Sequence, residues 1–149
     1  MDRLRSELAE SVARLDAGPW SPERLTALLA RAELRAWWVD ALEAPGLLAG
    51  SCPLGSGRVR VAYVGEMVGG RPEVGGYIVG RAIPVAAGGW VIFGHPSLVC
   101  DARALEFERL LGALRAPRGA FWQVHGGVIA RAARCGAPVP SASRAILAA

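Results

Sequence analysis

The chain has 149 residues, of which 52% are hydrophobic and 20% are charged, and its formal net charge is +4. This length suits a single domain over residues 1–149 with one buried core, and this composition excludes a disordered or low-complexity chain. All 17 basic residues are arginine, which indicates a GC-rich source genome more directly than a function. The arginines alternate with acidic residues and form no basic block, so we do not expect a nucleic-acid partner.

The small number of cysteines and histidines argues against a metal centre or a bound cofactor. Cys52, Cys100 and Cys135 are far apart, and the chain has only two histidines. A closed zinc site needs four such ligands at paired short spacings, so we predict no metal site and no cofactor. The first residues carry charges where a signal peptide has an apolar segment, and an odd number of cysteines suits reduced thiols. We therefore expect a cytoplasmic protein.

The N-terminal third has the pattern of two helices. Apolar residues recur every three or four positions over residues 4–15, which predicts an amphipathic helix. Ser21 followed by Pro22 is typical of a helix start, because serine caps the free amides and proline suits the first position. We expect this second helix to continue to about residue 44, before Pro45 and Gly46 end it.

The adjacent tryptophans Trp37 and Trp38 fall inside this second predicted helix. Neighbouring side chains on a helix point about 100° apart, so only one of the two can face the centre of the core. The other either packs against the glycine-rich loop at residues 46–57 or forms an aromatic wall of a pocket or partner surface.

Residues 58–100 have the pattern of an antiparallel sheet, with short valine- and isoleucine-rich runs separated by glycine and proline. We expect strands at residues 58–64, 73–79 and 90–93 and a short one at 98–100. The glycines between the first two could suggest a phosphate-binding loop, but the chain has no lysine and a strand follows, so a bulged hairpin is predicted. Residues 82–100 are uncharged, but their glycines and prolines favour buried strands over a membrane span.

The C-terminal third is predicted to add a helix, a strand and a shorter helix. Asp101 can cap a helix that reaches about residue 115. A strand is expected at residues 120–125 and a short helix at residues 126–134. The predicted fold is therefore α+β: a mostly antiparallel sheet of four to five strands, two N-terminal helices, and two further helices in the C-terminal half.

Side chains that could carry chemistry lie at the ends of predicted strands. His95 and His125 adjoin glycines, and Cys100 follows the last strand of the central sheet. A nearby histidine can convert a thiol into a nucleophilic thiolate, and Asp101 could orient that histidine. His95, Cys100 and His125 are therefore the candidate catalytic residues. The alternative is that the cysteine is a small buried apolar residue and the histidines belong to turns.

Aromatic residues suggest where a ligand could bind. A curved sheet with Tyr77, Trp90 and Trp122 beside it could enclose an apolar pocket, so these three are the candidate ligand-binding residues. The first hypothesis is a protein that binds, and could transform, a mostly apolar small molecule. The alternative is a non-enzymatic interaction, adaptor or assembly protein, which could be a homo-oligomer, because the mean hydropathy of +0.30 leaves room for an exposed apolar patch. The sequence leaves open whether the protein is an enzyme.

Overall fold

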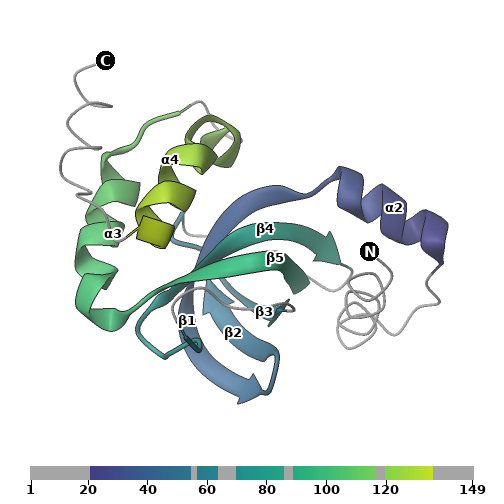
Figure 1. The fold of residues 1–149 in the computed structure, drawn as a ribbon, viewed down its shortest axis with the longest axis horizontal. Coiled ribbons are helices and arrows are strands. Elements are labelled where there is room, and N and C mark those ends of the chain that lie inside the picture. The colour runs from purple at the N-terminus through teal and green to yellow at the C-terminus, as the bar shows by residue number, and fades with distance from the viewer. Residues whose placement is uncertain (1–20, 55–56, 64–69, 86–88, 117–119, 136–149) are drawn as a thin grey trace.

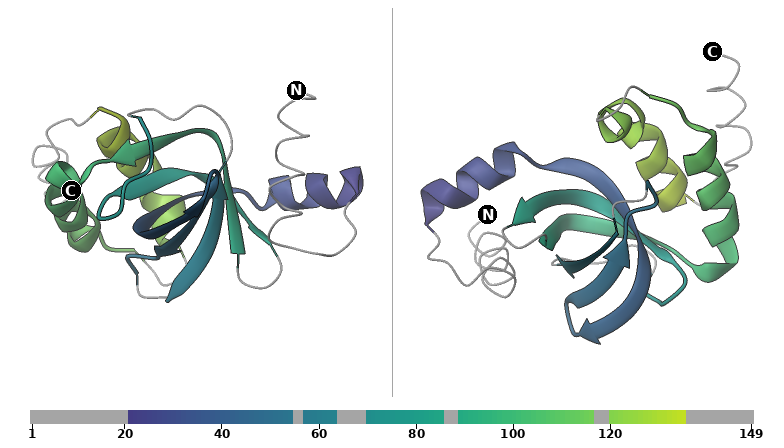
Figure 2. Two further views of the ribbon diagram at one scale, coloured as in Figure 1. Left: turned by 90° about the horizontal axis from the view of Figure 1, so that it is seen from below. Right: turned by 180° about the vertical axis from the view of Figure 1, so that it is seen from behind.

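The computed structural model describes residues 21–54, 57–63, 70–85, 89–116 and 120–135. These residues form a closed five-stranded β-barrel that follows one helix and precedes two others (Figure 1). In chain order the elements are α2 (Pro22–Ala30), β1 (Glu33–Ala44), β2 (Leu47–Ser51), β3 (Arg58–Tyr63), β4 (Tyr77–Val85), β5 (Gly89–Val99), α3 (Asp101–Ala113) and α4 (Phe121–Cys135). Figure 2 shows α3 and α4 together on one side of the barrel and α2 on the other.

The barrel closes because β1 pairs with both β2 and β4. The strand order is β1-β2-β3-β5-β4, with four antiparallel pairs and one parallel pair, between β3 and β5. This is a five-stranded Greek-key barrel of the OB type. Closure leaves none of the five strands with an unpaired edge, which removes the usual route to edge-to-edge aggregation.

Two glycines, one in β4 and one just before it, let β5 approach closely. A Cβ atom on Gly80 would lie 2.8 Å from Cγ2 of Ile92, so the interior has no room for a side chain there. A Cβ atom on Gly76 would lie 2.4 Å from the carbonyl oxygen of Val99. Because Tyr77 is in register with Val99, the glycine lets the first pair of the β4–β5 ladder form.

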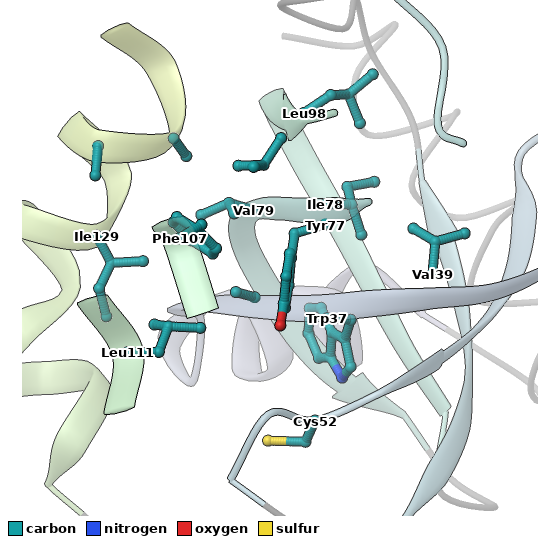
Figure 3. Close-up of a cluster of buried hydrophobic side chains, with 14 of the residues drawn as sticks. Trp37, Val39, Cys52, Tyr77, Ile78, Val79, Leu98, Phe107, Leu111 and Ile129 are labelled. Atoms are coloured by element: carbon teal, nitrogen blue, oxygen red, sulfur yellow. The ribbon is translucent and has the colours of Figure 1, made fainter. Parts of the chain in front are cut away.

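Most of the buried side chains form one cluster that joins the barrel to α3 and α4 (Figure 3). Trp37 and Phe107 are each 1% exposed, and burying an aromatic side chain of this kind contributes roughly 2–3 kcal/mol. A second, smaller cluster lies beneath α2, where Leu29 and Ala32 pack against buried residues of the barrel. The helices therefore cover two different outer faces of one barrel.

The predicted open sheet with two N-terminal helices is wrong. The start of the second helix is confirmed, since the backbone amide of Arg24 donates to Oγ of Ser21 at 3.2 Å, but α2 ends at Ala30 and β1 follows. Both faces of β1 are covered, one by the barrel interior and one by α3 and α4, so apolar residues occur on both faces. Without alternation, such a strand resembles a helix in sequence. The other predicted helix, at residues 4–15, lies outside the described residues.

The remaining predicted elements are partly confirmed. The strand at residues 58–64 is β3, with Arg58 and Arg60 exposed as expected. The pair of buried strands at residues 82–100 is also confirmed, although residues 90–93 and 98–100 belong to one continuous strand, β5. The strand expected at residues 73–79 begins only at Tyr77. Among the described segments, every helix is too short or too polar to span a bilayer, while the cytoplasmic location stays a prediction.

The two elements expected after residue 120 are a single helix. Buried positions recur there every three or four residues, at Trp122, His125, Gly126, Ile129, Ala132 and Ala133. This is the period of a helix packed on one face, and it overrides the strand-like composition of the first six residues. Gly126 does not break the helix, because a Cβ atom there would meet Cβ of Leu34 on β1 at 3.4 Å and close packing favours the small residue.

Candidate functional site

A cavity lies between one end of the barrel and α3. Its volume is about 420 Å³, within the range of ligand pockets. It is lined by Trp38 of β1, Ser51 of β2, Cys52, Pro53 and Leu54 of the following loop, Tyr77 of β4, and Glu108, Leu111 and Gly112 of α3. The walls are mainly apolar, with a few polar groups among them.

Strand register explains why these residues meet. Trp38 is in register with Ser51 on β2 and with Tyr77 on β4. The three side chains therefore form a row across neighbouring strands, on the outer face of the barrel that α3 covers. The row comes from three segments that are far apart in the sequence.

Two aromatic contacts fix the Tyr77 ring. The rings of Trp38 and Tyr77 meet edge to face, with centroids 5.2 Å apart and planes at 80°. The Phe107 ring of α3 contacts the other side of Tyr77, with centroids 5.0 Å apart. In Figure 3 the Tyr77 hydroxyl points toward the side of the cluster on which Cys52 lies. The ring is thus held by packing, and its hydroxyl is aimed at the cavity.

Tyr77 is only 2% exposed as a whole residue, and its hydroxyl makes no hydrogen bond to another described residue. The hydroxyl is not sealed from solvent, because no fully buried side-chain oxygen or nitrogen of the described residues lacks a partner. Burial of the side chain and the nearby Glu108 carboxylate raise the pKa of Tyr77 from 10.0 to about 12. The hydroxyl therefore keeps its proton at neutral pH and can donate a hydrogen bond to a molecule in the cavity.

The other polar groups of the cavity support binding more than catalysis. The hydroxyl of Ser51 donates to the Asp40 carboxylate in a short hydrogen bond, so its proton is already used. Cys52 is buried, and none of the described residues that line the cavity is a histidine that could convert this thiol into a thiolate. Glu108 is exposed and is the one charged residue of the described lining.

The three predicted ligand-binding residues lie in different places. Tyr77 lines the cavity, as described above. The Trp90 ring contacts that of Trp37 at a tilt of 51°, with centroids 5.5 Å apart, and the Arg35 guanidinium lies 4.2 Å above the Trp90 ring. Since Trp90 is in register with Pro84, it lies toward the opposite end of β4 from Tyr77. Trp122 is buried in α4, where its ring meets that of Phe121 edge to face.

The structure does not bring Cys100 and His125 into one cavity. Cys100 is exposed and lines a second cavity of about 140 Å³, together with Arg71, Glu73, Tyr77, Leu98, Val99 and Arg103. His125 is buried in α4, where its Nε2 donates to the carbonyl oxygen of Arg115 at 2.6 Å. The side chain of His95 lies outside the described residues. The expectation of a strand end at His125 is wrong, because this residue lies within α4.

Asp101 does not cap α3 as predicted. It is the first residue of the helix, and Cys100 holds the cap position with an extended backbone. The side chain of Cys100 makes no capping hydrogen bond. In the described part of the chain no group of three or more Cys, His, Asp or Glu side chains could hold a metal ion.

Most lining residues were not predicted from the sequence. Trp38 was considered as an aromatic wall, but on a helix, and the loop at residues 52–54 carried no signal beyond its glycine-rich surroundings. Once the covered face of α3 is known, its helical period predicts that Glu108, Leu111 and Gly112 lie together on it. Comparisons with known protein families, with curated proteins and with solved structures gave no match for this chain.

Proposed function

We propose that this protein binds a small, mostly apolar molecule in the cavity between the barrel and α3. The observation that carries the proposal is the Tyr77 hydroxyl, which faces the cavity and has no partner among the described residues. A ligand with an acceptor atom at this place could accept a hydrogen bond from the hydroxyl, while Trp38 and Leu111 contact its apolar part.

Two other classes of partner have less support. Barrels of this type can bind nucleic acids, but a shared architecture does not carry function. The exposed arginines of β3 are paired with carboxylates: Arg60 lies 3.2 Å from Glu43, and Arg58 lies 4.0 Å from Asp40. The carboxylates offset the positive charge that a phosphate backbone would contact.

A protein-interaction role is the alternative that the sequence left open. The large apolar side chains exposed among the described residues are Leu42, Leu54, Val74, Leu105 and Val124. They lie on separate segments: β1, the loop after β2, the chain before β4, α3 and α4. No specific observation therefore favours this role over a ligand-binding one, and only Leu54 belongs to the cavity.

A pair of glycine substitutions tests the proposal. Gly112 lines the cavity and Gly127 does not, although both are helical and a Cβ atom on either would meet nothing within 4 Å. Gly112→Phe should therefore fill the cavity without unfolding the protein, and Gly127→Phe is the matched control.

The measurement is binding of neutral, cationic and anionic phenylalkyl compounds, followed by the NMR signals of the tryptophan indole N–H groups. We expect at least one compound to shift the Trp38 signal. Gly112→Phe should weaken that binding at least about tenfold, since the ligand must displace a buried ring, while Gly127→Phe leaves it unchanged. The proposal is wrong if no compound binds, or if both variants bind as the wild type does.

A further inference from the structure

The described lining of the cavity between the barrel and α3 contains one charge. Glu108 is the one charged residue among the described residues that line it. The Asp40 carboxylate lies just behind the lining as the partner of Ser51, and Arg58 at 4.0 Å offsets part of its charge. Within the described lining, an anionic ligand would therefore meet the Glu108 carboxylate and no cation.

The cavity also adjoins the C-terminal end of α3. Leu111 and Gly112 belong to the last turn of this helix, which ends at Ala113. The free carbonyl groups of a last turn carry partial negative charge and favour nearby cations. Arg115 already donates to the carbonyl oxygen of Gly112 at 2.7 Å, so one of these groups has a cationic partner. Arg115 therefore offsets part of the helix-end charge, and Glu108 is the main negative group at the cavity.

The negative field of the Glu108 carboxylate also acts on Tyr77. The Glu108 carboxylate adds to burial in raising the pKa of the tyrosine, because a second negative charge in the cavity would be repelled. The same field that opposes a phenolate attracts a positive charge at the same place.

Aromatic faces complete the site. The rings of Trp38 and Tyr77 stand nearly perpendicular, at 80°, with their centroids 5.2 Å apart, and both line the cavity. Two such rings form a corner in which a cation can contact π-electron density within about 6 Å of a ring centroid. Pro53, Leu54 and Leu111 leave the rest of the wall apolar.

We propose that the ligand of this cavity is an organic cation, an ammonium group on an apolar body, seated in the corner of Trp38 and Tyr77 beside Glu108. This inference rests on the proposed function, since it names the chemical class of the molecule that the same cavity would bind. The apolar body lies along Pro53, Leu54 and Leu111, and the ammonium group faces the rings.

The test compares three probes of similar size on the full chain by titration calorimetry: 2-phenylethyl-trimethylammonium, neutral 4-phenylbutan-2-one and anionic 3-phenylpropionate. We expect the cation to bind at least about fivefold tighter than the neutral probe and the anion to bind most weakly. If the neutral probe binds as tightly as the cation, or the anion binds tightest, the inference is overturned while the proposed function stands. If none of the three binds, both fail.

A charge variant separates this site from general surface electrostatics. Glu108→Gln should reduce the preference for the cation over the neutral probe about threefold, because an exposed carboxylate contributes modestly. Glu106→Gln removes an equally exposed charge from the same helix but outside the cavity lining, and it should leave the preference unchanged. Both substitutions are at exposed positions, so both variants should fold. An equal loss in the two variants, or no loss in Glu108→Gln, contradicts the inference.

Discussion

Replacing Tyr77 by phenylalanine should affect stability only at high pH. At pH 7 the substitution removes a hydroxyl that has no hydrogen-bond partner among the described residues, so we expect the free energy of unfolding to change by less than about 0.5 kcal/mol. A hydroxyl with a good partner would cost about 1 kcal/mol or more. The aromatic packing on Trp38 and Phe107 is the same for either ring.

At high pH the two proteins should differ, because the pKa of Tyr77 is raised from 10.0 to about 12 in the folded state. Between these values the unfolded chain has lost the proton and the folded protein still holds it. The contribution of Tyr77 to the free energy of unfolding is therefore fully present below pH 10 and is lost as the pH rises through about 12. Two pKa units correspond to at most roughly 2.7 kcal/mol.

Urea unfolding of both proteins at intervals from pH 9 to pH 12 measures this difference. The wild type should lose about 2–3 kcal/mol more than Tyr77→Phe over this range. Tyr63→Phe is the control, because Tyr63 is the second of the two tyrosines and does not line the cavity. Parallel losses in the wild type and in Tyr77→Phe would refute the raised pKa of Tyr77, and a large cost at pH 7 would refute a hydroxyl without a hydrogen-bond partner among the described residues.

Two further substitutions test the packing that holds the cavity in place. Gly76→Ala puts a Cβ atom 2.4 Å from the carbonyl oxygen of Val99, so we expect a loss of at least about 2 kcal/mol in urea unfolding. The helical control Gly127→Ala should gain up to about 1 kcal/mol, and similar results for both would contradict the tight contact. His125→Ala removes the 2.6 Å hydrogen bond to the carbonyl of Arg115 and leaves a small void, so we expect a loss of roughly 2–4 kcal/mol in the free energy of unfolding. Thermal unfolding measures this loss. A loss near zero would mean that this bond does not hold α4 to the chain after α3.

How far the fold can be predicted depends on which faces of an element are covered. β3 has exposed arginines on one face, so its alternation was readable and its position is correct. β1 is covered on both faces, and its apolar residues looked helical for that reason. The sequence predicts a strand and a short helix in place of α4 for a related reason. The aromatic residues at its start are typical of a strand, and only the buried positions, at intervals of three and four, reveal the helix. Closure of the barrel depends on contacts between distant segments, which no local pattern contains.

The site was less predictable than the fold. Tyr77 was selected as an aromatic residue of the sheet, and it lines the cavity. Trp90 and Trp122 had the same aromatic signal but serve in packing, Trp90 against Trp37 of the barrel and Trp122 on the buried face of α4. Composition alone cannot separate these uses, because the difference lies in which face of each element is covered. The loop residues Cys52 and Pro53 reach the cavity only because β2 ends beside β1.

The two neighbouring tryptophans show how replacing the predicted helix by a strand alters the interpretation of their function. On a helix, Trp37 and Trp38 would point about 100° apart, and only one of them could face the centre of the core. On β1 they point to opposite faces, so Trp37 fills the barrel interior against Trp90 while Trp38 lies outside, beside Tyr77 and Ser51. Trp38 lines the cavity together with the loop residues Cys52, Pro53 and Leu54, and its role in binding stays a proposal. The same side chain packs against Tyr77. A substitution such as Trp38→Leu would change both, which is why the charge of Glu108 and the empty space beside Gly112 are better places to test the site.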